Sequence, residues 1–343
     1  MATPANNLFD RLKSAGSIHS EVVSKSIFFK PKSVTQLPIP IFNLANSGSL
    51  DGGLASGVNV IAGPSRHFKT TLALVEIKAY MDKHKDAYCI FYDSEFGVTH
   101  ANILANNIDE ERVLHVPILH IEQLKFDIVQ KLKEVKAGDH VIFFVDSIGN
   151  LASKKEVDDA ENENEAADMS RAKAIKSLFR IITPHFTIKD IPALIIAHVY
   201  DEQKMYGKTI VSGGTGIMLS SNNVWILGRS QEKDGTDLTG YKFSITIDKS
   251  RFVKEKSKFE FSVSFDGGIN RWSGLLALAV ESGHVIKPSN GWYQKNGEDT
   301  KCREADTNNI KFWGSILTDK TFNDFVRGKY QLAVGSIMTS DEK

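Results

Sequence analysis

The sequence contains almost no cysteine, no long apolar run and no excess of charge of either sign. The two cysteines, Cys89 and Cys302, are too few for a disulfide framework or a cysteine-rich metal site, and such sparse use is typical of a reducing compartment. The longest apolar stretches, at residues 191–197 and 275–280, fall far short of the roughly 20 residues that cross a membrane. The start of the chain lacks a charged segment followed by an apolar block, so we expect no secretory signal and a cytoplasmic location.

The balance of charge argues against one mode of nucleic-acid binding. Lys plus Arg and Asp plus Glu number 42 each, whereas a protein that holds nucleic acid by bulk charge carries an excess of basic residues. Any contact with phosphate therefore has to be local. The hydrophobic fraction of 41% in 343 residues predicts one large α/β core with small appendages.

The loop after the first apolar strand predicts a phosphate-binding site. Residues 58–62 form an apolar run typical of a buried strand, and apolar residues recur at helical spacing from Leu72 to Met81. A strand, a glycine-led loop, a Lys-Thr pair and a helix are the context of a phosphate-binding loop, where the helix N-terminus stabilises an anion. Lys69 would reach the β- and γ-phosphates of ATP, and the Thr70 hydroxyl would bind Mg²⁺. The loop residues expected to bind this cofactor are Gly63, Pro64, Ser65, Arg66, His67, Phe68, Lys69, Thr70 and Thr71.

Phe68 departs from the usual pattern of this loop, which has a second glycine at that position. If the loop keeps its usual path, Phe68 must adopt whatever backbone angles the turn requires, and a non-glycine residue with positive φ is uncommon. The alternative is a Gly-Pro turn that caps an ordinary helix.

The strand candidates predict a mostly parallel sheet with an antiparallel extension. Four apolar runs, at 87–92, 113–116, 140–145 and 193–199, alternate with helical patterns, which is typical of a parallel sheet covered on both faces. Later runs follow one another without helices, and the last of them alternates apolar and polar residues, which favours an antiparallel extension. These later runs are 224–227, 243–247 and 259–265.

The two ends of the chain differ from this core. Residues 1–30 carry too few apolar groups to fold alone, so this arm must pack on its own core or on a neighbouring subunit. A small mixed region begins near Asn270.

Polar residues follow three of the core strands, at the edge where ligands gather in open parallel sheets. Asp146 would orient Mg²⁺ through water, although an aspartate that caps a following helix is the alternative. Asp93 and Glu95 both qualify as a general base for water, with a turn role as the alternative. His198 would lie beside the γ-phosphate, unless it is a core-edge histidine satisfied by backbone.

Two long loops follow the fourth and fifth strands, and loops this long inside a compact domain are usually functional or disordered. Residues 153–168 are acidic, which is also typical of a solvated helix face, and a basic cluster that could meet phosphates follows them. Residues 200–218 place an apolar-aromatic pair among glycines, which suits insertion between bases, with a disordered lid as the alternative. The candidate DNA-binding residues are Arg171, Lys173, Lys176, Met205, Tyr206, Gly207, Gly213 and Gly214.

Five blocks carry a resemblance to a known family. They are Gly-Pro-Ser-x-x-Phe-Lys at 63–69, Phe-Tyr-Asp-Ser-Glu-Phe-Gly at 91–97, Asp-Ser-x-Gly-Asn-Leu-Ala-Ser-Lys-Lys-Glu at 146–156, Gly-Gly-Thr-Gly at 213–216 and Lys-Ser-Arg-x-Val-Lys-Glu-Lys-Ser-Lys-Phe at 249–259. Through them the chain resembles the RecA/Rad51 recombinases over nearly its whole length, and most closely the UvsX-type strand-exchange proteins of tailed phages. Phe68 is a marker of the latter.

The resemblance implies a fold and an ATP site. The fold would be α/β, with a RecA-like P-loop NTPase core over 31–268, an N-terminal oligomerisation arm over 1–30, and a small α+β C-terminal domain over 269–343 that captures duplex DNA. ATP and Mg²⁺ would be the cofactors, with Lys69 and Thr70 on the triphosphate and its metal, and Asp146 in support of the metal. Glu95 would be the general base, and His198 would couple the γ-phosphate to the second DNA-binding loop. Lys249 and Arg251 would reach the neighbouring subunit's γ-phosphate, and Asn102 stands where relatives often place a tyrosine against the adenine.

The implied activity is a DNA-dependent ATPase that forms helical filaments on single-stranded DNA and catalyses strand exchange. Loops 153–168 and 199–217 would line the single strand, and Tyr206 would insert into it. The implied partners are single- and double-stranded DNA, further copies of the chain, a single-strand-binding protein and a recombination mediator, with no membrane, in the cytoplasm of an infected bacterium.

Two other classes of protein use the same core. A helicase-type motor normally has an arginine finger and an extra N-terminal docking domain, so Lys249, Arg251 and the short arm favour the recombinase. A nucleotide-gated DNA-binding regulator without chemistry would not need Glu95 and Asp146 together with the Lys69-Thr70 pair.

Overall fold

The computed structural model describes residues 8–16, 20–26, 29, 33–136, 138–162, 170–201 and 209–332. The chain divides into two compact units, Met1–Ser33 and Val34–Lys343. The first unit contains helix α1 (Leu8–Ser14), whose Leu8, Phe9 and Leu12 side chains are exposed. Within the described ranges, no helix combines the length and apolarity that a membrane crossing requires.

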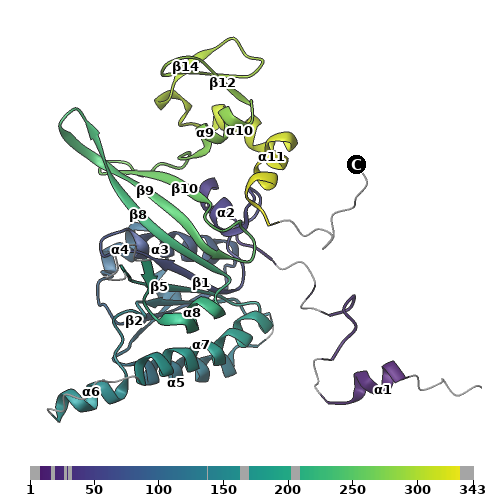
Figure 1. Cartoon of the computed structure of the whole chain (residues 1–343), viewed down its shortest axis with the longest axis vertical. Coiled ribbons are helices and arrows are strands. Elements are labelled where there is room, and N and C mark those ends of the chain that lie inside the picture. Colours follow the sequence, from purple (N-terminus) through teal and green to yellow (C-terminus); the bar gives the residue numbers. More distant parts are fainter. Residues whose placement is uncertain are drawn as a thin grey trace, which may run out of the picture. The chain divides into compact units, whose positions relative to one another are not determined.

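A nine-stranded sheet forms the centre of the second unit (Figure 1). Its order is β11-β10-β9-β8-β1-β5-β4-β2-β3, and the strands from β8 to β3 run parallel. The predicted mostly parallel sheet with an antiparallel extension is confirmed. The strands are β1 (Gly57–Ala62), β2 (Tyr88–Asp93), β3 (Val113–Pro117), β4 (Val141–Asp146), β5 (Pro192–Ala197), β8 (Asn223–Asp234), β9 (Asp237–Ser250), β10 (Lys258–Ser264) and β11 (Gly268–Ile269).

The direction of β8 differs from the prediction for residues 224–227. We expected this run in the antiparallel extension, but β8 pairs parallel with β1 and antiparallel with β9, so the extension begins at β9. A strand that pairs in parallel with its neighbour has to be reached by a crossover connection. The connection into β8 includes helix α8 (Gly214–Ser220), which lies within the glycine-rich segment.

Helices cover both faces of the sheet. The sheet therefore separates the core into two apolar clusters. The inner residues of β4 alternate between them, with Ile142 and Phe144 in the cluster that includes α2 and α3, and Phe143 and Val145 in the cluster that includes α5 and α7. This accounts for the continuously apolar strands, because both sheet faces are dry. The helices of this part are α2 (Pro40–Ser47), α3 (Lys69–Lys83), α4 (His100–Ala105), η2 (Glu110–Arg112), α5 (Ile121–Glu134), α6 (Lys154–Glu161) and α7 (Ser170–Ile188).

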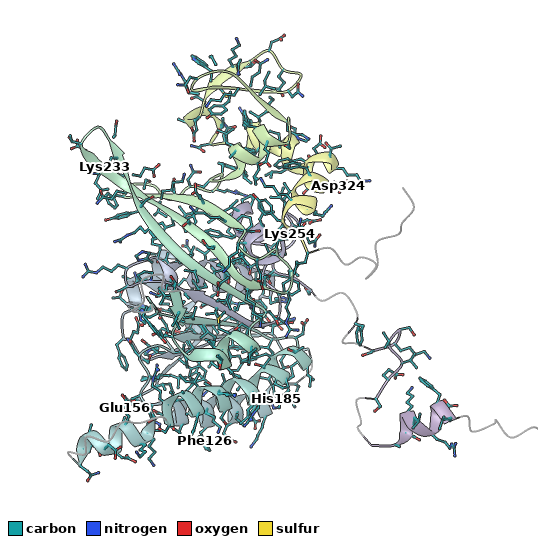
Figure 2. All side chains as sticks on the ribbon, viewed as in Figure 1. Phe126, Glu156, His185, Lys233, Lys254 and Asp324 are labelled. Carbon is teal, nitrogen blue, oxygen red and sulfur yellow. The ribbon has the colours of Figure 1, made fainter. Side chains whose placement is uncertain are left out.

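The region after β11 is α+β, as expected. Its three-stranded antiparallel sheet packs with helices around Trp313, which is fully buried and stacks on Trp272 with ring centroids 6.3 Å apart. The elements are α9 (Leu275–Glu281), β12 (Val285–Ser289), β13 (Trp292–Lys295), β14 (Lys301–Arg303), η3 (Ala305–Thr307), α10 (Ile310–Thr318) and α11 (Lys320–Tyr330). In contrast, the β8–β9 ribbon extends to an exposed end near Lys233 (Figure 2).

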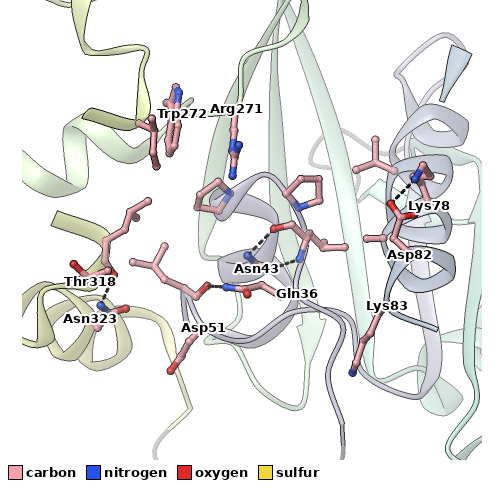
Figure 3. A pocket seen from close by; sticks show the side chains of 18 of the residues that line it. Gln36, Asn43, Asp51, Lys78, Asp82, Lys83, Arg271, Trp272, Thr318 and Asn323 are labelled. Atoms are coloured by element: carbon pink, nitrogen blue, oxygen red, sulfur yellow. Dashed lines mark hydrogen bonds and ion pairs between the residues drawn. The ribbon is translucent and has the colours of Figure 1, made fainter. Parts of the chain in front are cut away.

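A cavity of about 1070 Å³ lies between the α2–α3 side of the core and the C-terminal helices (Figure 3). Asp51 and Lys83 line it from the core, and Trp272 and Asn323 line it from the C-terminal region. The Arg327 guanidinium reaches across to Asp51 at 2.6 Å, so an ion pair joins the two sides.

Glu76, a residue of α3, has a fully buried carboxyl group. The Asn46 amide donates a hydrogen bond of 2.8 Å to Glu76 Oε1, while Asn46 Oδ1 is buried without a hydrogen-bond partner among the described residues. Burial raises the pKa of Glu76 to about 7 from its ordinary value of 4.5, against the lowering effect of the Asn46 hydrogen bond. The native state therefore holds the Glu76 proton more tightly than the unfolded chain does.

Replacing Glu76 by Gln is expected to change how stability depends on pH. Because the native pKa is the higher one, the free energy of unfolding of the wild type should fall as pH rises from about 4.5 to about 7, by on the order of 3 kcal/mol. Glu76→Gln keeps an acceptor for Asn46 but cannot ionise, so its stability relative to the wild type should increase between pH 5 and pH 8. Urea unfolding at both pH values measures this difference, and Glu134→Gln on the exposed end of α5 is the control. A pH-independent difference for Glu76→Gln would contradict the assignment.

Candidate active site

The predicted phosphate loop lies between β1 and α3, and its turn has the left-handed backbone that such loops need. Phe68 has φ 65° and precedes α3 as its N-cap, and Arg66 has φ 60°. The Phe68 ring packs at 5.2 Å from the ring of Phe243, on the edge of the core cluster. Packing of this ring compensates for a conformation that glycine would adopt without strain.

Three of the predicted residues meet at the start of α3 and the end of β4. Lys69 is buried, and its ammonium donates a hydrogen bond of 2.9 Å to the Pro64 carbonyl. Thr70 Oγ1 donates a 2.7 Å hydrogen bond to Asp146 Oδ2. Burial lowers the pKa of Lys69, although the nearby carboxylates Glu95 and Asp146 act in the opposite direction.

The surroundings of Asp146 fit a hard divalent cation. Its Oδ1 atom is buried and has no hydrogen-bond partner among the described residues. Burial raises the pKa of Asp146 to about 6, against the hydrogen bond from Thr70 and with added repulsion from the Glu95 and Asp93 carboxylates. A cation beside this oxygen would satisfy it and favour its ionised form, and carboxylate and hydroxyl oxygens are the donors that Mg²⁺ prefers.

Glu95 lies just beyond β2 and contacts two other strand ends. Ser147 Oγ donates a hydrogen bond to Glu95 Oε1, and His198 Nε2 lies 2.6 Å from the same oxygen. Burial acts to raise the pKa of Glu95, but the hydrogen bonds from Ser147 and His198 and the charges of His198 and Lys69 outweigh it, so the net shift is downward. Glu95 is therefore an ionised carboxylate at neutral pH.

Asp93, the other candidate base, is used by the turn. Its side chain is buried, and Oδ1 accepts hydrogen bonds from the backbone N–H groups of Glu95 and Phe96 at 3.1 and 2.7 Å. Its Oδ2 lies 3.1 Å from His115 Nε2. The geometry gives Asp93 the turn role that was its alternative and leaves Glu95 as the better candidate for a base.

His198 connects Glu95 to the segment that follows β5. Its backbone N–H donates to Ser212 Oγ at 2.9 Å, and the Ser212 N–H donates to the His198 carbonyl at 2.7 Å. This pair closes a hairpin of β6 (Val199–Asp201) and β7 (Thr209–Val211). The predicted Met205, Tyr206 and Gly207 come between β6 and β7 in the sequence and lie outside the described residues. Ser147 and Ser212 were not among the predicted site residues, because a lone serine after a strand carries no signal of its own.

The other candidate DNA-binding residues lie on α7 and at the start of α8. Gly213 has φ 103° and Gly214 has φ 68°, so both adopt the left-handed backbone that favours glycine. Lys173 and Lys176 are exposed on α7. Arg171 instead donates hydrogen bonds to the backbone carbonyls of Ile148, Gly149 and Leu151, and so supports the turn after β4.

Part of the acidic loop at 153–168 is helical. Residues 154–161 form α6, which has no buried residue and starts with a capping box between Ser153 and Glu156. This agrees with its alternative interpretation as a solvated helix face, and Figure 2 shows Glu156 on this helix. Residues 163–168 lie outside the described part of the chain.

The hydrogen-bond partners that the described residues give to Lys249, Arg251 and Asn102 lie outside the phosphate loop. Among the described residues, Lys249 Nζ contacts the carbonyls of Met218 and Leu219 at the end of α8, and the Arg251 N–H donates to the Asn222 carbonyl. Asn102 caps α4 by accepting hydrogen bonds from the Thr99 N–H and hydroxyl at 2.9 and 2.8 Å.

The register places the two cations away from the end of β1 that carries the phosphate loop. Lys249 is opposite Val224 at the start of β8, and the neighbouring Asn223 is opposite Asn59 of β1, whereas the loop leaves β1 after Ala62.

Comparisons with known proteins agree on one family. A family model described as "Bacteriophage T4, Recombination and repair protein, C-terminal domain" matches residues 272–326. The recombination and repair protein of Enterobacteria phage T4 is 46% identical over 331 residues, which covers 94% of this chain and 85% of that protein. Protein RecA of Chlorobaculum tepidum is 29% identical over 254 residues, covering 72% of this chain and 70% of RecA. The mitochondrial DNA repair protein recA homolog 3 of Arabidopsis thaliana is 25% identical over 296 residues, covering 82% of this chain and 66% of the homolog.

Proposed function

The chain belongs to the UvsX branch of the RecA recombinases, and we propose that it hydrolyses ATP as a helical filament on single-stranded DNA. Within that filament it would pair the bound strand with a homologous duplex and exchange the strands. The observation that supports the proposal is the contact between Glu95 and His198 at 2.6 Å, near the Thr70–Asp146 pair, because it would join the candidate nucleotide site to the β6–β7 hairpin.

Residues of the phosphate loop hold the triphosphate in this proposal. The backbone N–H groups of 63–71 and the Lys69 ammonium bind the phosphates, and Lys69 leaves the Pro64 carbonyl to do so. Thr70 and Asp146 would hold Mg²⁺, with Asp146 acting through water. The ion would supply positive charge that offsets the negative charge of the phosphates. Asn102 would lie near the adenine. Its side-chain oxygen takes part in the capping box of α4, so its amide nitrogen would be the group that contacts the base.

Glu95 is the general base in this proposal. Its lowered pKa keeps it ionised at neutral pH, so it can accept a proton from the water that attacks the γ-phosphate. Ser147 and His198 orient the carboxylate through contacts with the same oxygen, Oε1.

His198 transmits the state of the nucleotide to the DNA. A change in its hydrogen bond to Glu95 would shift the His198–Ser212 pair and, through it, the hairpin that carries Met205, Tyr206 and Gly207. Tyr206 inserts between bases of the single strand, while Lys173, Lys176 and the backbone around Gly213 and Gly214 hold phosphates. Arg171 contributes indirectly, by fixing the turn after β4.

Assembly completes the site in this proposal. Lys249 and Arg251 of one subunit reach the γ-phosphate bound by its neighbour, which agrees with their position away from their own phosphate loop. These cations contact triphosphate but not ADP, so ATP favours the assembled state. The arm 1–30, with its exposed Leu8, Phe9 and Leu12, packs on the neighbour, and the domain 269–343 captures duplex beside the core 31–268. A single-strand-binding protein and a mediator would act with it in the cytoplasm of an infected bacterium.

A D-loop assay with ATP and a homologous supercoiled duplex tests this function. Joint molecules should form with the homologous duplex and not with an unrelated one, and DNA binding should weaken as salt rises. Failure to assemble on single strands with a non-hydrolysable ATP analogue would contradict the proposal. Unwinding of duplex without homology would favour the helicase-type motor instead.

A further inference from the structure

Two histidines and an aspartate cluster at the end of the core opposite the candidate active site. His84 ends α3, Asp86 precedes β2 and His140 precedes β4. One ligand atom of each residue lies within 4.8 Å of the others. Both Asp86 carboxylate oxygens are 3.0 Å from His140 Nδ1, and the two imidazole rings stack with centroids 3.9 Å apart.

We propose that His84, Asp86 and His140 bind a divalent transition-metal ion of the zinc class. Imidazole nitrogens and a carboxylate oxygen are the donors that Zn²⁺ takes at about 2.0–2.2 Å, and three protein ligands leave a fourth tetrahedral position for water. Mg²⁺ prefers oxygen donors only, so the ion of the Thr70–Asp146 site does not compete for this one.

Small side-chain movements convert the observed cluster into a binding geometry. Donors around a tetrahedral zinc lie about 3.3 Å apart, which follows from bond lengths of about 2.0–2.1 Å. The Asp86–His140 separation is already close to this value, and the His84 ligand atom has to approach by about 1.5 Å at most. The two stacked imidazole rings also have to rotate, so that a nitrogen of each points at the ion. The Asp86 side chain is 71% exposed and that of His140 is 36% exposed, so both can rotate without repacking the core.

The ion would join three elements of the core. His84 is at the far end of α3 from Lys69, and Tyr88 of β2 is opposite Val141 at the start of β4, whereas Asp93 is opposite Asp146 at the other end of the same pair. A metal here would therefore tie the end of α3 to the starts of β2 and β4, away from the nucleotide. Because it binds the folded chain and not the unfolded one, it would raise the stability of the core.

Zinc titration of the untagged full-length chain, in buffer containing Mg²⁺, tests the proposal. Calorimetry and elemental analysis should find one zinc per chain, and Co²⁺ in its place should give the visible absorption of a tetrahedral site. His84→Gln and His140→Gln should each weaken zinc binding by roughly 100-fold or more, because loss of even an outer-shell partner costs about 10- to 100-fold, and should abolish the zinc-dependent rise in thermal unfolding temperature. His185→Gln, at an exposed histidine of α7, is the control and should change neither (Figure 2).

The variants must keep their fold and DNA-stimulated ATPase rate without zinc, which separates a lost ligand from a damaged core. Asp86→Asn supplies a second test, because asparagine can still hydrogen-bond His140 but is a weaker ligand. Equal zinc affinity in wild type and all three variants would overturn the proposal. No zinc uptake by the wild type would also overturn it and leave Asp86 with the single role of orienting His140.

Discussion

A Glu95→Gln protein is expected to hydrolyse ATP at least about 100-fold more slowly than the wild type on single-stranded DNA, and up to about 10,000-fold more slowly. The physical reason is that glutamine has no carboxylate to accept a proton from the water that, in the proposed function, attacks the γ-phosphate. Glutamine keeps the shape and can still accept hydrogen bonds from Ser147 and His198, so binding of ATP and of DNA should remain. Phosphate release measures turnover, and fluorescence anisotropy of a labelled oligonucleotide measures DNA binding.

The control for this experiment is Glu134→Gln, at an exposed residue of α5, which should retain the wild-type rate. A normal rate in Glu95→Gln would move the base to another group, with Asp93 the next candidate. Substitution of Asp93 would not by itself test its role as a base. Its carboxylate accepts hydrogen bonds from the turn that carries Glu95, so the substitution would also disturb that turn. Loss of both turnover and ATP binding in Glu95→Gln would point instead to a structural role in the site.

Replacing Lys249 and Arg251 together by alanine is expected to lower turnover by about 1,000-fold or more, the range found for cations supplied to a γ-phosphate in trans. The same change should abolish the preference of the filament for ATP over ADP, since the two cations would contact only the triphosphate. DNA-stimulated phosphate release and the length of filaments with each nucleotide measure the two effects. Lys258→Ala on the neighbouring strand removes an exposed ion pair with Glu260 and should be close to neutral.

A mixing experiment distinguishes action across subunits from a local structural role. Lys249 also contacts the carbonyls at the end of α8, so the double variant could lose activity through that helix alone. Lys69→Ala has intact Lys249 and Arg251 but a defective phosphate loop, and the double variant has the reverse. Because the contact would be head-to-tail, random mixing should create a competent site at about a quarter of the subunit boundaries. No recovery of ATPase activity on mixing two inactive proteins that assemble together would contradict action in trans.

Much of the fold and the local part of the site could be predicted from the residues in order. The strand candidates 87–92, 113–116 and 140–145 correspond to β2, β3 and β4. The reason is clearest for β4, because a strand buried on both faces leaves an uninterrupted apolar run. The phosphate loop was predictable for a similar reason. Its strand, turn, Lys-Thr pair and helix are consecutive, so the whole unit lies within one short stretch.

Pairing across the sheet was decided by the tertiary structure alone. The parallel direction of β8 depends on α8, a helix too short and too rich in glycine to show a pattern. Glu76 is a charged residue type, so sequence periodicity would place its side of α3 toward solvent. In the structure α2 lies against this side, and Asn46 of α2 donates a hydrogen bond to Glu76.

The sequence by itself determined which residue types stand at the strand ends, since each belongs to a local apolar run or motif. The tertiary structure decided which of them meet. Glu95, Ser147, His198 and Ser212 come from segments far apart in the chain, and the strand order β5-β4-β2 brings them to one edge. The same order brings His84 and Asp86 to His140 at the opposite edge. Strand order is a property of the packed sheet, because it follows from how the crossover helices cover its two faces, and no single stretch of sequence records it.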